Sequence, residues 1–343
     1  MNKKFIFLPL VALLVILIHS FITSCTKTPK EVVVYTTIDQ IFSEPILRDF
    51  ERESGIKVKA VYDTEETKST GVLNRLIAEA KNPQCDVFWS GDPIRAVVLK
   101  QRGLTQPYVS EEAKDIPKWY KDPEHHWTGF SARARVLIYN TSLPEASTLP
   151  KSIFDLSNPD LKYNVAIANP LFGTTTFHIA ALFYVLGEDK AIDFLNRLKE
   201  NGILIASSNG DVKKKVAQGE IFCGLTDTDD AFTAKKQGAP VDYLFLDQDK
   251  GQIGTLIIPN VVTLIKGAPH PENGKRLIDY LLSRETEAKL AKSCAQMPLH
   301  KGVPTPEDVP SLDDIRPMKI DYDKTARLMV EIQGVLKRWV ESE

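Results

Sequence analysis

Residues 32–62 have the sequence VVVYTTIDQIFSEPILRDFERESGIKVKAVY. The apolar run 32–35 does not alternate with polar residues, which indicates a strand buried on both faces of a sheet. Apolar side chains then recur at helical spacing up to Gly55, which ends the helix before a second strand over residues 56–62. Such a strand, helix and strand in succession predict a parallel sheet covered by helices.

The same alternation continues to the end of the 343-residue chain. Helices are expected over residues 72–77, 174–186, 191–198, 211–218, 271–282, 285–293 and 322–339. Strands are expected over residues 85–89, 136–139, 203–206, 221–225, 241–246 and 256–265. No repeat of fixed period occurs, and a chain of this length divides into two lobes more readily than it extends one sheet. We therefore predict an α/β protein of the doubly wound type with two lobes.

The N-terminus has the pattern of an export signal. Lys3 and Lys4 precede an apolar run over residues 5–18, which is shorter than the about 20 residues that a membrane-spanning helix needs. Small residues come just before Cys25, in a pattern that resembles the lipobox of bacterial lipoproteins. We expect residues 1–24 to be removed and Cys25 to be lipidated, so that the protein is extracytoplasmic and anchored to a membrane. The alternative is an ordinary secretory signal followed by a chance cysteine.

Composition narrows the classes of function. The formal net charge of −2 provides no basic excess for binding nucleic acid. Besides Cys25 there are three cysteines, which allow one disulfide at most, and we interpret all three as structural: Cys85, Cys223 and Cys294. The motifs GxSxG, GxxxxGK[ST], GxGxxG and HExxH do not occur. The chain is therefore not expected to be an enzyme, although an exported hydrolase that uses an aspartate as a base is a competing class.

Polar and acidic residues gather where the predicted strands end, which is where ligands bind in open α/β sheets. These clusters are Thr36, Thr37 and Asp39; Ser90, Gly91 and Asp92; Ser207, Ser208 and Asn209; and Thr226, Asp227, Thr228, Asp229 and Asp230. In addition, Gly173, Thr174 and Thr175 open a predicted helix, whose free N–H groups and hydroxyls can hold an anion. This chemistry suits binding rather than turnover.

Several blocks in order carry a family resemblance. They are residues 32–37, 86–92 (DVFWSGD), 129–140 (GFSARARVLIYN), 154–156, 169–175 and 224–231 (GLTDTDDA). Together they resemble the periplasmic solute-binding proteins of iron(III)-type ABC transporters, a branch of the type II periplasmic-binding-protein fold. The resemblance extends over nearly all of the chain after the signal.

This resemblance implies two lobes that close around a ligand in an interlobe cleft. Residues 25–30 would form a tether, 31–132 the first part of lobe 1, 133–254 lobe 2, and 255–343 the return to lobe 1 with a C-terminal helical region. The implied partners are an ABC permease and its ATPase, with the chain acting as a monomer and without a cofactor. Arg133, the helix start at 173–175, Ser208 and Asn209 match positions that hold a companion anion beside iron.

One departure from the family pattern concerns the metal ligands. Ferric-binding members supply two adjacent tyrosines after the strand that corresponds to residues 221–225, whereas this chain has residues 226–230, TDTDD. Carboxylates at Asp39, Asp92, Asp227, Asp229 and Asp230 could bind a hard cation with an anion instead. The alternatives are the phosphate or phosphonate of an organic solute, or a cationic amine neutralised by the aspartates. We expect iron(III) or an iron–anion complex, with Asp92, Asp227, Asp229 and Asp230 as candidate metal ligands.

Overall fold

The computed structural model describes residues 30–63, 71–147 and 149–342. The predicted signal peptide and Cys25, the predicted lipidation site, lie outside the described residues. None of the helices in these ranges combines the length and the apolar character that crossing a membrane requires.

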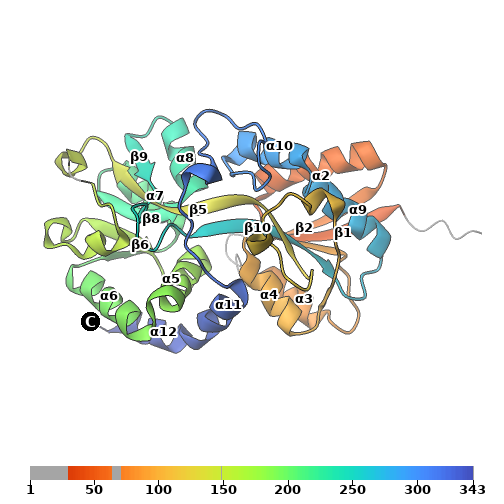
Figure 1. Ribbon diagram of the computed structural model, residues 1–343, viewed down its shortest axis with the longest axis horizontal. Coiled ribbons are helices and arrows are strands. Elements are labelled where there is room, and N and C mark those ends of the chain that lie inside the picture. Colours follow the sequence, from red (N-terminus) through yellow and green to blue (C-terminus); the bar gives the residue numbers. More distant parts are fainter. Residues whose placement is uncertain (1–29, 64–70, 148, 343) are drawn as a thin grey trace, which may run out of the picture.

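The described elements alternate between strands and helices, as predicted (Figure 1). The strands are β1 (Glu31–Thr36), β2 (Lys57–Tyr62), β3 (Val87–Ser90), β4 (Thr105–Gln106), β5 (Thr128–Asn140), β6 (Val165–Ala168), β7 (Leu204–Ala206), β8 (Cys223–Asp227), β9 (Val241–Leu244) and β10 (Ile257–Ile265). The helices are α2 (Gln40–Ser54), α3 (Gly71–Ala78), α4 (Pro93–Gln101), α5 (Gly173–Leu186), α6 (Glu188–Glu200), α7 (Asn209–Ala217), α8 (Thr228–Lys236), α9 (Pro271–Leu281), α10 (Arg284–Cys294), α11 (Tyr322–Glu331) and α12 (Gln333–Glu341).

The two-lobed α/β fold is confirmed (Figure 1). In the first lobe the strand order is β2-β1-β3-β10, with β4 also paired to β10. In the second lobe the order is β5-β8-β6-β7, with β9 paired to β5. Neighbouring strands pair in parallel between β1, β2 and β3 and between β6, β7 and β8, because helices cross over between them. Helices flank both sheets and enclose the apolar core.

Strands β5 and β10 connect the lobes. The first half of β5 pairs with β10 as far as Ala134, and from Arg135 onward β5 pairs with β8. We call the point between Ala134 and Arg135 the junction. The register of β5 against β10 shifts between Pro259 and Asn260, so Ser131 has no partner opposite it and forms a bulge with a φ of 41°.

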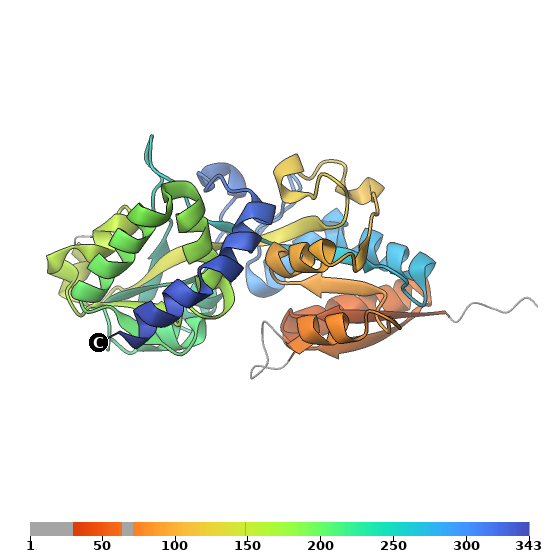
Figure 2. The ribbon, with the colours of Figure 1, turned by 90° about the horizontal axis from the view of Figure 1, so that it is seen from below.

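The C-terminal residues contact both lobes. Helix α11 packs against α4 of the first lobe and α5 of the second, and α12 follows it along the second lobe (Figure 2). Sequence periodicity predicts one helix over residues 322–339, but the structure has two, separated at the buried Ile332. The three cysteines of the described residues are free and buried, as the structural interpretation requires.

Candidate functional site

Polar residues from both lobes meet beside the junction. They lie at the carboxyl ends of β1, β3 and β8 and at the starts of the helices that follow these strands and β6. Open α/β sheets bind ligands at this edge because loops there approach each other and helix starts present free N–H groups. The strand ends that the sequence singled out therefore belong to one region.

Arg135 organises the second-lobe half of this region. Its guanidinium is fully buried, and Nη1 donates to Oδ1 of Asp227 at 2.8 Å, to Oδ1 of Asn209 at 3.1 Å and to Oγ1 of Thr174 at 3.2 Å. The hydroxyl of Thr174 donates to Oδ2 of Asp227 at 2.9 Å, and Nδ2 of Asn209 donates to Thr174 at 2.8 Å. One arginine thus connects the ends of three elements, β8, α5 and α7. Arg135 is not among the site residues predicted from the sequence.

Arg133 lies two residues earlier on the same face of β5 and connects the lobes. Its Nη2 donates to the carbonyl oxygen of Gly91, which follows β3 of the first lobe. Its Nη1 lies 3.6 Å from the carboxylates of both Asp227 and Asp229 in the second lobe. The side chain keeps 17% of its surface exposed, and its buried Nε has no hydrogen-bond partner among the described residues.

The pKa values of the carboxylates near Arg133 are shifted in opposite directions. Burial opposes ionisation of Asp227, but the charges of Arg135 and Arg133 outweigh this effect and lower its pKa. Burial and the nearby Asp230 raise the pKa of Asp229 to about 7, although Arg133 opposes this shift. The pKa of Arg133 itself is raised by the surrounding aspartates against the effect of burial. Asp227 is therefore a fixed charge, whereas Asp229 responds to its surroundings.

The first-lobe half of the site is made by residues after β1 and β3. The hydroxyl of Thr37 accepts a hydrogen bond from the Gly91 N–H at 2.9 Å, which joins the two loops. Asp92 caps α4 by accepting from the N–H groups of Ile94 and Arg95, and it forms an ion pair with the Arg95 side chain. The carboxylate of Asp92 is thus already engaged with helix and arginine donors.

The start of α5 offers donors to an anion. Gly173 has a φ of 61°, which a glycine adopts without strain, and it lets the chain turn into the helix. No side chain of the described residues caps this helix start, so its first N–H groups remain available. Thr174 and Thr175 both contact Arg135 there, at 3.2 and 3.5 Å.

The remaining predicted site residues have mainly local contacts. Thr36 accepts from the Ile38 N–H, and Ser90 accepts from the Asp92 N–H at 3.4 Å. Asp39 and Ser208 stand at the N-caps of α2 and α7, and both are exposed. The Thr226 hydroxyl donates to Asp230 at 3.2 Å, and Lys213 also pairs with Asp230 at 3.0 Å.

The predicted metal ligands do not gather into one cluster. Across residues 30–63, 71–147 and 149–342, no group of three or more histidines, cysteines or acidic residues is arranged to hold a metal ion. Asp92 pairs with Arg95, Asp227 with Arg135, and Asp230 with Lys213. Hard cations need at least six oxygen ligands, so a cation here would require oxygens from a companion molecule.

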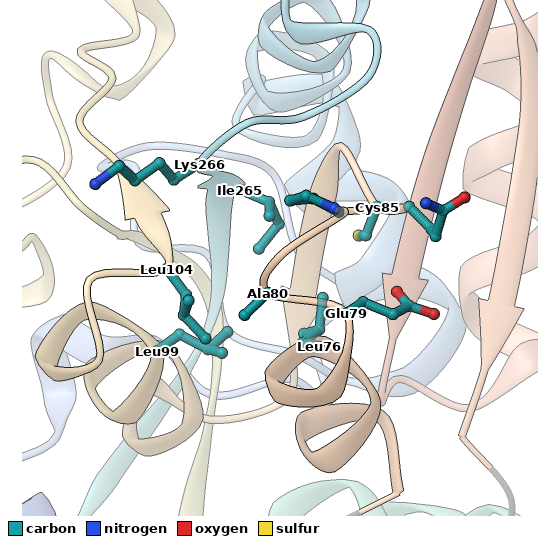
Figure 3. A pocket seen from close by; sticks show the side chains of 10 residues that line it. Leu76, Glu79, Ala80, Cys85, Leu99, Leu104, Ile265 and Lys266 are labelled. Carbon is teal, nitrogen blue, oxygen red and sulfur yellow. The ribbon is translucent and has the colours of Figure 1, made fainter.

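A separate small cavity lies on the outer side of the first lobe (Figure 3). Its volume of about 10 Å³ is room for a single water molecule. Figure 3 shows apolar side chains around it, among them Leu76, Leu99, Leu104 and Ile265. The cavity is a packing gap and does not contribute to the site beside the junction.

A family model for bacterial extracellular solute-binding proteins matches residues 85–326. The chain belongs to this family. These solute-binding proteins are extracytoplasmic components of ABC importers, and they deliver their solutes to a permease and its ATPase. The chain is therefore a transport component rather than an enzyme, as the missing catalytic motifs predicted.

Known relatives and structures support the same assignment for this solute-binding protein. A periplasmic protein of Salmonella typhimurium, provisionally named as binding 2-aminoethylphosphonate, is 26% identical over 84% of each chain. Iron uptake protein A1 of Synechocystis is 25% identical over 91% of each chain. The crystal structure of iron-bound HitA from Pseudomonas aeruginosa covers 89% of this chain and 99% of its own, with a TM-score of 0.79 and 23% identity. The last comparison shows that the fold is shared.

Proposed function

We propose that this solute-binding protein carries iron(III) as a complex with a companion anion. The observation that supports it most is the position of Arg133, whose guanidinium contacts both lobes and has a buried Nε without a hydrogen-bond partner among the described residues. The start of α5 adds backbone N–H groups that no N-cap side chain occupies. Relatives named for iron uptake and iron binding favour the metal as part of the cargo.

The proposed ligand is a complex rather than a bare ion because the carboxylates are few and separately paired. Asp229 is the carboxylate nearest to Arg133 that has no lysine or second arginine beside it in the described contacts. In this proposal Asp229 contributes an oxygen to the iron, Asp92, Asp227 and Asp230 surround the site, and the anion supplies the remaining oxygens. The anion in turn binds Arg133 and the helix start at Gly173, Thr174 and Thr175, while Asn209 holds Thr174 and Asp227 in place.

Titration of the purified protein with iron(III) citrate, followed by calorimetry and iron analysis, tests this proposal. We expect one iron per chain, and we expect Arg133→Gln to weaken binding by more than about tenfold, the scale of a charged hydrogen bond. Arg197→Gln is the matched control, because Arg197 pairs with Asp193 on α6, far from the site. Binding that is equally strong in Arg133→Gln would contradict the proposal.

A second candidate is an aminoalkyl phosphonate. A specific feature favours it, since Arg133 and Asp229 present opposite charges 3.6 Å apart, which suits a ligand with a phosphonate at one end and an ammonium group at the other. The Salmonella relative is named for such a compound. Titration with 2-aminoethylphosphonate in metal-free buffer distinguishes the two candidates, because the iron proposal predicts no binding there.

The anchoring and the domain limits complete the proposal. We propose that Cys25 is lipidated and that the protein acts as a tethered monomer, with lobe 1 formed by residues 31–132 and 255–343 and lobe 2 by residues 133–254. The change of partner along β5, after Ala134, supports a limit close to residue 133.

Replacing Cys25 by alanine should move the protein from the membrane fraction to the soluble fraction. Retention in the membrane fraction would contradict lipidation at this residue.

A further inference from the structure

Glu287 is a buried carboxylate near the junction. It is not one of the residues of the binding site. It is completely inaccessible to solvent and lies on α10. Its Oε1 accepts from the N–H groups of Ser131 at 2.7 Å and Leu299 at 2.8 Å. Its Oε2 accepts from the N–H of His300 at 3.0 Å and contacts Nδ1 of the His300 ring at 2.8 Å. A buried carboxylate with four donors is held firmly in one position.

The contacts of the His300 ring favour its charged form, because the Glu287 carboxylate raises the pKa of the ring against the effect of burial. Nδ1 faces the Glu287 carboxylate, and Nε2 lies 2.7 Å from the carbonyl oxygen of Glu112. An ionised carboxylate and a carbonyl oxygen can only accept, so both ring nitrogens must donate. The two residues therefore form a buried ion pair next to the bulge of β5, and breaking such a pair from one side leaves an uncompensated charge.

The partner of Glu287 on β5 is the bulge residue Ser131. This residue has a left-handed φ of 41°, which is unfavourable for a side chain other than glycine and persists only when the surroundings hold it. The N–H that Ser131 gives to Glu287 is the contact that fixes this turn of the backbone. Arg133 follows two residues later, so the direction in which its guanidinium points depends on the bulge.

Helix α10 also contacts the acidic side of the site. It packs against α2 of the first lobe and α8 of the second, and lies across the connection between the lobes (Figure 1). Helix α8 begins at Thr228, next to the site aspartates. The segment after α10 pairs with β5 as well, through reciprocal hydrogen bonds between Met297 and Ala132 at 2.7 and 2.8 Å.

We propose that the buried Glu287–His300 pair is a positioning element for ligand binding, because it fixes the bulge at Ser131 and thereby aims Arg133 between the lobes. This inference rests on the proposed anion-binding role of Arg133. Glu287 touches no ligand, so its effect on affinity passes through the backbone of β5 and through the angle between the lobes.

A second buried pair provides a matched control. Asp86 is also inaccessible to solvent, and it accepts from the N–H groups of Val33 at 2.7 Å and His270 at 2.5 Å and contacts Nδ1 of His270 at 3.1 Å. This pair lies in the first lobe between β1, β3 and α9, away from the junction. Asp86→Asn should therefore lower stability without changing the geometry of the binding site.

The experiment compares Glu287→Gln with Asp86→Asn, using distances between spin labels in the two lobes. The spin labels are attached to cysteines introduced at two exposed positions, by Gln101→Cys on α4 and Asn196→Cys on α6. Cys25 is replaced by alanine in the same protein. The cysteines of the described residues are buried, so the labels attach to the introduced thiols. We expect Glu287→Gln to broaden the distance distribution of the ligand-free protein and Asp86→Asn to leave it unchanged.

Binding of iron(III) citrate and of 2-aminoethylphosphonate is measured in the same variants. Glu287→Gln should weaken whichever probe the wild type binds by about tenfold, the size of one charged hydrogen bond, while Asp86→Asn stays within about twofold. Equal effects of the two variants on distance and affinity would overturn the inference. If the wild type binds neither probe, the proposed function fails, whereas the label distances still decide the role of Glu287. Should Glu287→Gln not fold, Glu287→Asp keeps the charge and is measured in the same way.

Discussion

At the scale of single residues, the buried Arg135 shows that several residues of the site stabilise one another. A guanidinium without solvent contact is tolerated because Asp227 neutralises it and because Thr174 and Asn209 take up further donors. The same pairing makes Asp227 an integral part of the second lobe. Replacing Asp227 should therefore lower the stability of the protein as well as its affinity for the ligand.

Replacing Arg135 by methionine tests this view. The substitution leaves the Asp227 carboxylate buried without its closest partner, and we expect a loss of about 3–5 kcal/mol in the free energy of unfolding. Urea denaturation measures the change. The double variant Arg135→Met with Asp227→Leu should recover part of the loss, whereas an additive further loss would contradict a strong pairing.

His300 predicts a dependence of stability on pH. Burial alone would lower the pKa of His300, but the hydrogen bond and charge of Glu287 outweigh this effect and raise it above 6.5. A raised pKa in the folded state means that the stabilisation is complete below pH about 6.5 and is lost as pH rises through the folded value. The difference in unfolding free energy between wild type and His300→Gln should therefore shrink above pH 6.5. A difference that grows with pH would contradict the ion pair.

The sequence indicates some of these residues better than others. Hydroxyl and acidic residues after strands could be recognised because they interrupt apolar runs at places where ligands bind. Arg135 stands inside the run RARVLIY, and a charge within a buried strand was itself a sign that a partner must exist. That the partner is Asp227 could not be deduced, because it depends on the pairing of β5 with β8 across 92 residues.

At the scale of elements, helix α4 shows that sequence periodicity can miss a helix that is buried on most sides. Residues 93–101 were not expected to be helical, because apolar side chains surround the helix instead of forming one stripe, and most of them are buried. The start signals were nevertheless present, with Asp92 at the cap and Pro93 in the first turn. Likewise β5 begins eight residues before the expected strand at residue 136, because its first half pairs with β10 of the other lobe.

The cap of α4 gives a prediction that separates structure from ligand binding. Asparagine keeps the cap but not the charge that pairs with Arg95, so Asp92→Asn should cost less unfolding free energy than Asp92→Ala, which loses both the ion pair and the cap, the cap alone being worth about 1 kcal/mol. Thermal unfolding measures both. Affinity for iron(III) citrate is then compared: a weaker complex in Asp92→Asn would favour a carboxylate role in the site, and equal affinity would limit Asp92 to capping.

At the scale of the whole molecule, Tyr322 joins the two lobes. Its ring contacts Trp127, just before β5, with centroids 5.6 Å apart, and Phe177 of α5 in the second lobe at 6.2 Å. Its hydroxyl donates to the carbonyl oxygen of Ile257 on β10 at 3.3 Å. The ring is buried where both connecting strands and the second lobe meet, so it couples the folding of the lobes.

Tyr322→Ala should therefore lower both the stability of the protein and the cooperativity of its unfolding. We expect a loss of about 3–5 kcal/mol, the range for removing a buried aromatic ring, and a less concerted transition in calorimetry. Tyr322→Phe, which removes only the hydroxyl, should cost about 1 kcal/mol and keep a single transition. Separate unfolding of the lobes in the phenylalanine variant would show that the hydroxyl, and not the ring, connects them.

The two-lobed architecture could be predicted from alternating strands and helices, but the relative arrangement of the lobes could not. Local periodicity identifies each β-α unit, whereas the junction depends on a bulge at Ser131 and on contacts from α10 and α11, which are distant in sequence. No local pattern marks that bulge, since serine is common in strands and turns alike. The interlobe geometry is thus a property of long-range packing.

The charged groups around the site have a consequence for transport itself. Arg133, Arg135 and Lys213 face Asp227, Asp229 and Asp230, so positive and negative side chains are equal in number there. A cargo with little overall charge can be enclosed in such surroundings without leaving an excess of either sign, and the nearly neutral region exerts little attraction at a distance. The side chains at this site should therefore contribute little electrostatic attraction to the rate of capture, and little dependence of that rate on ionic strength.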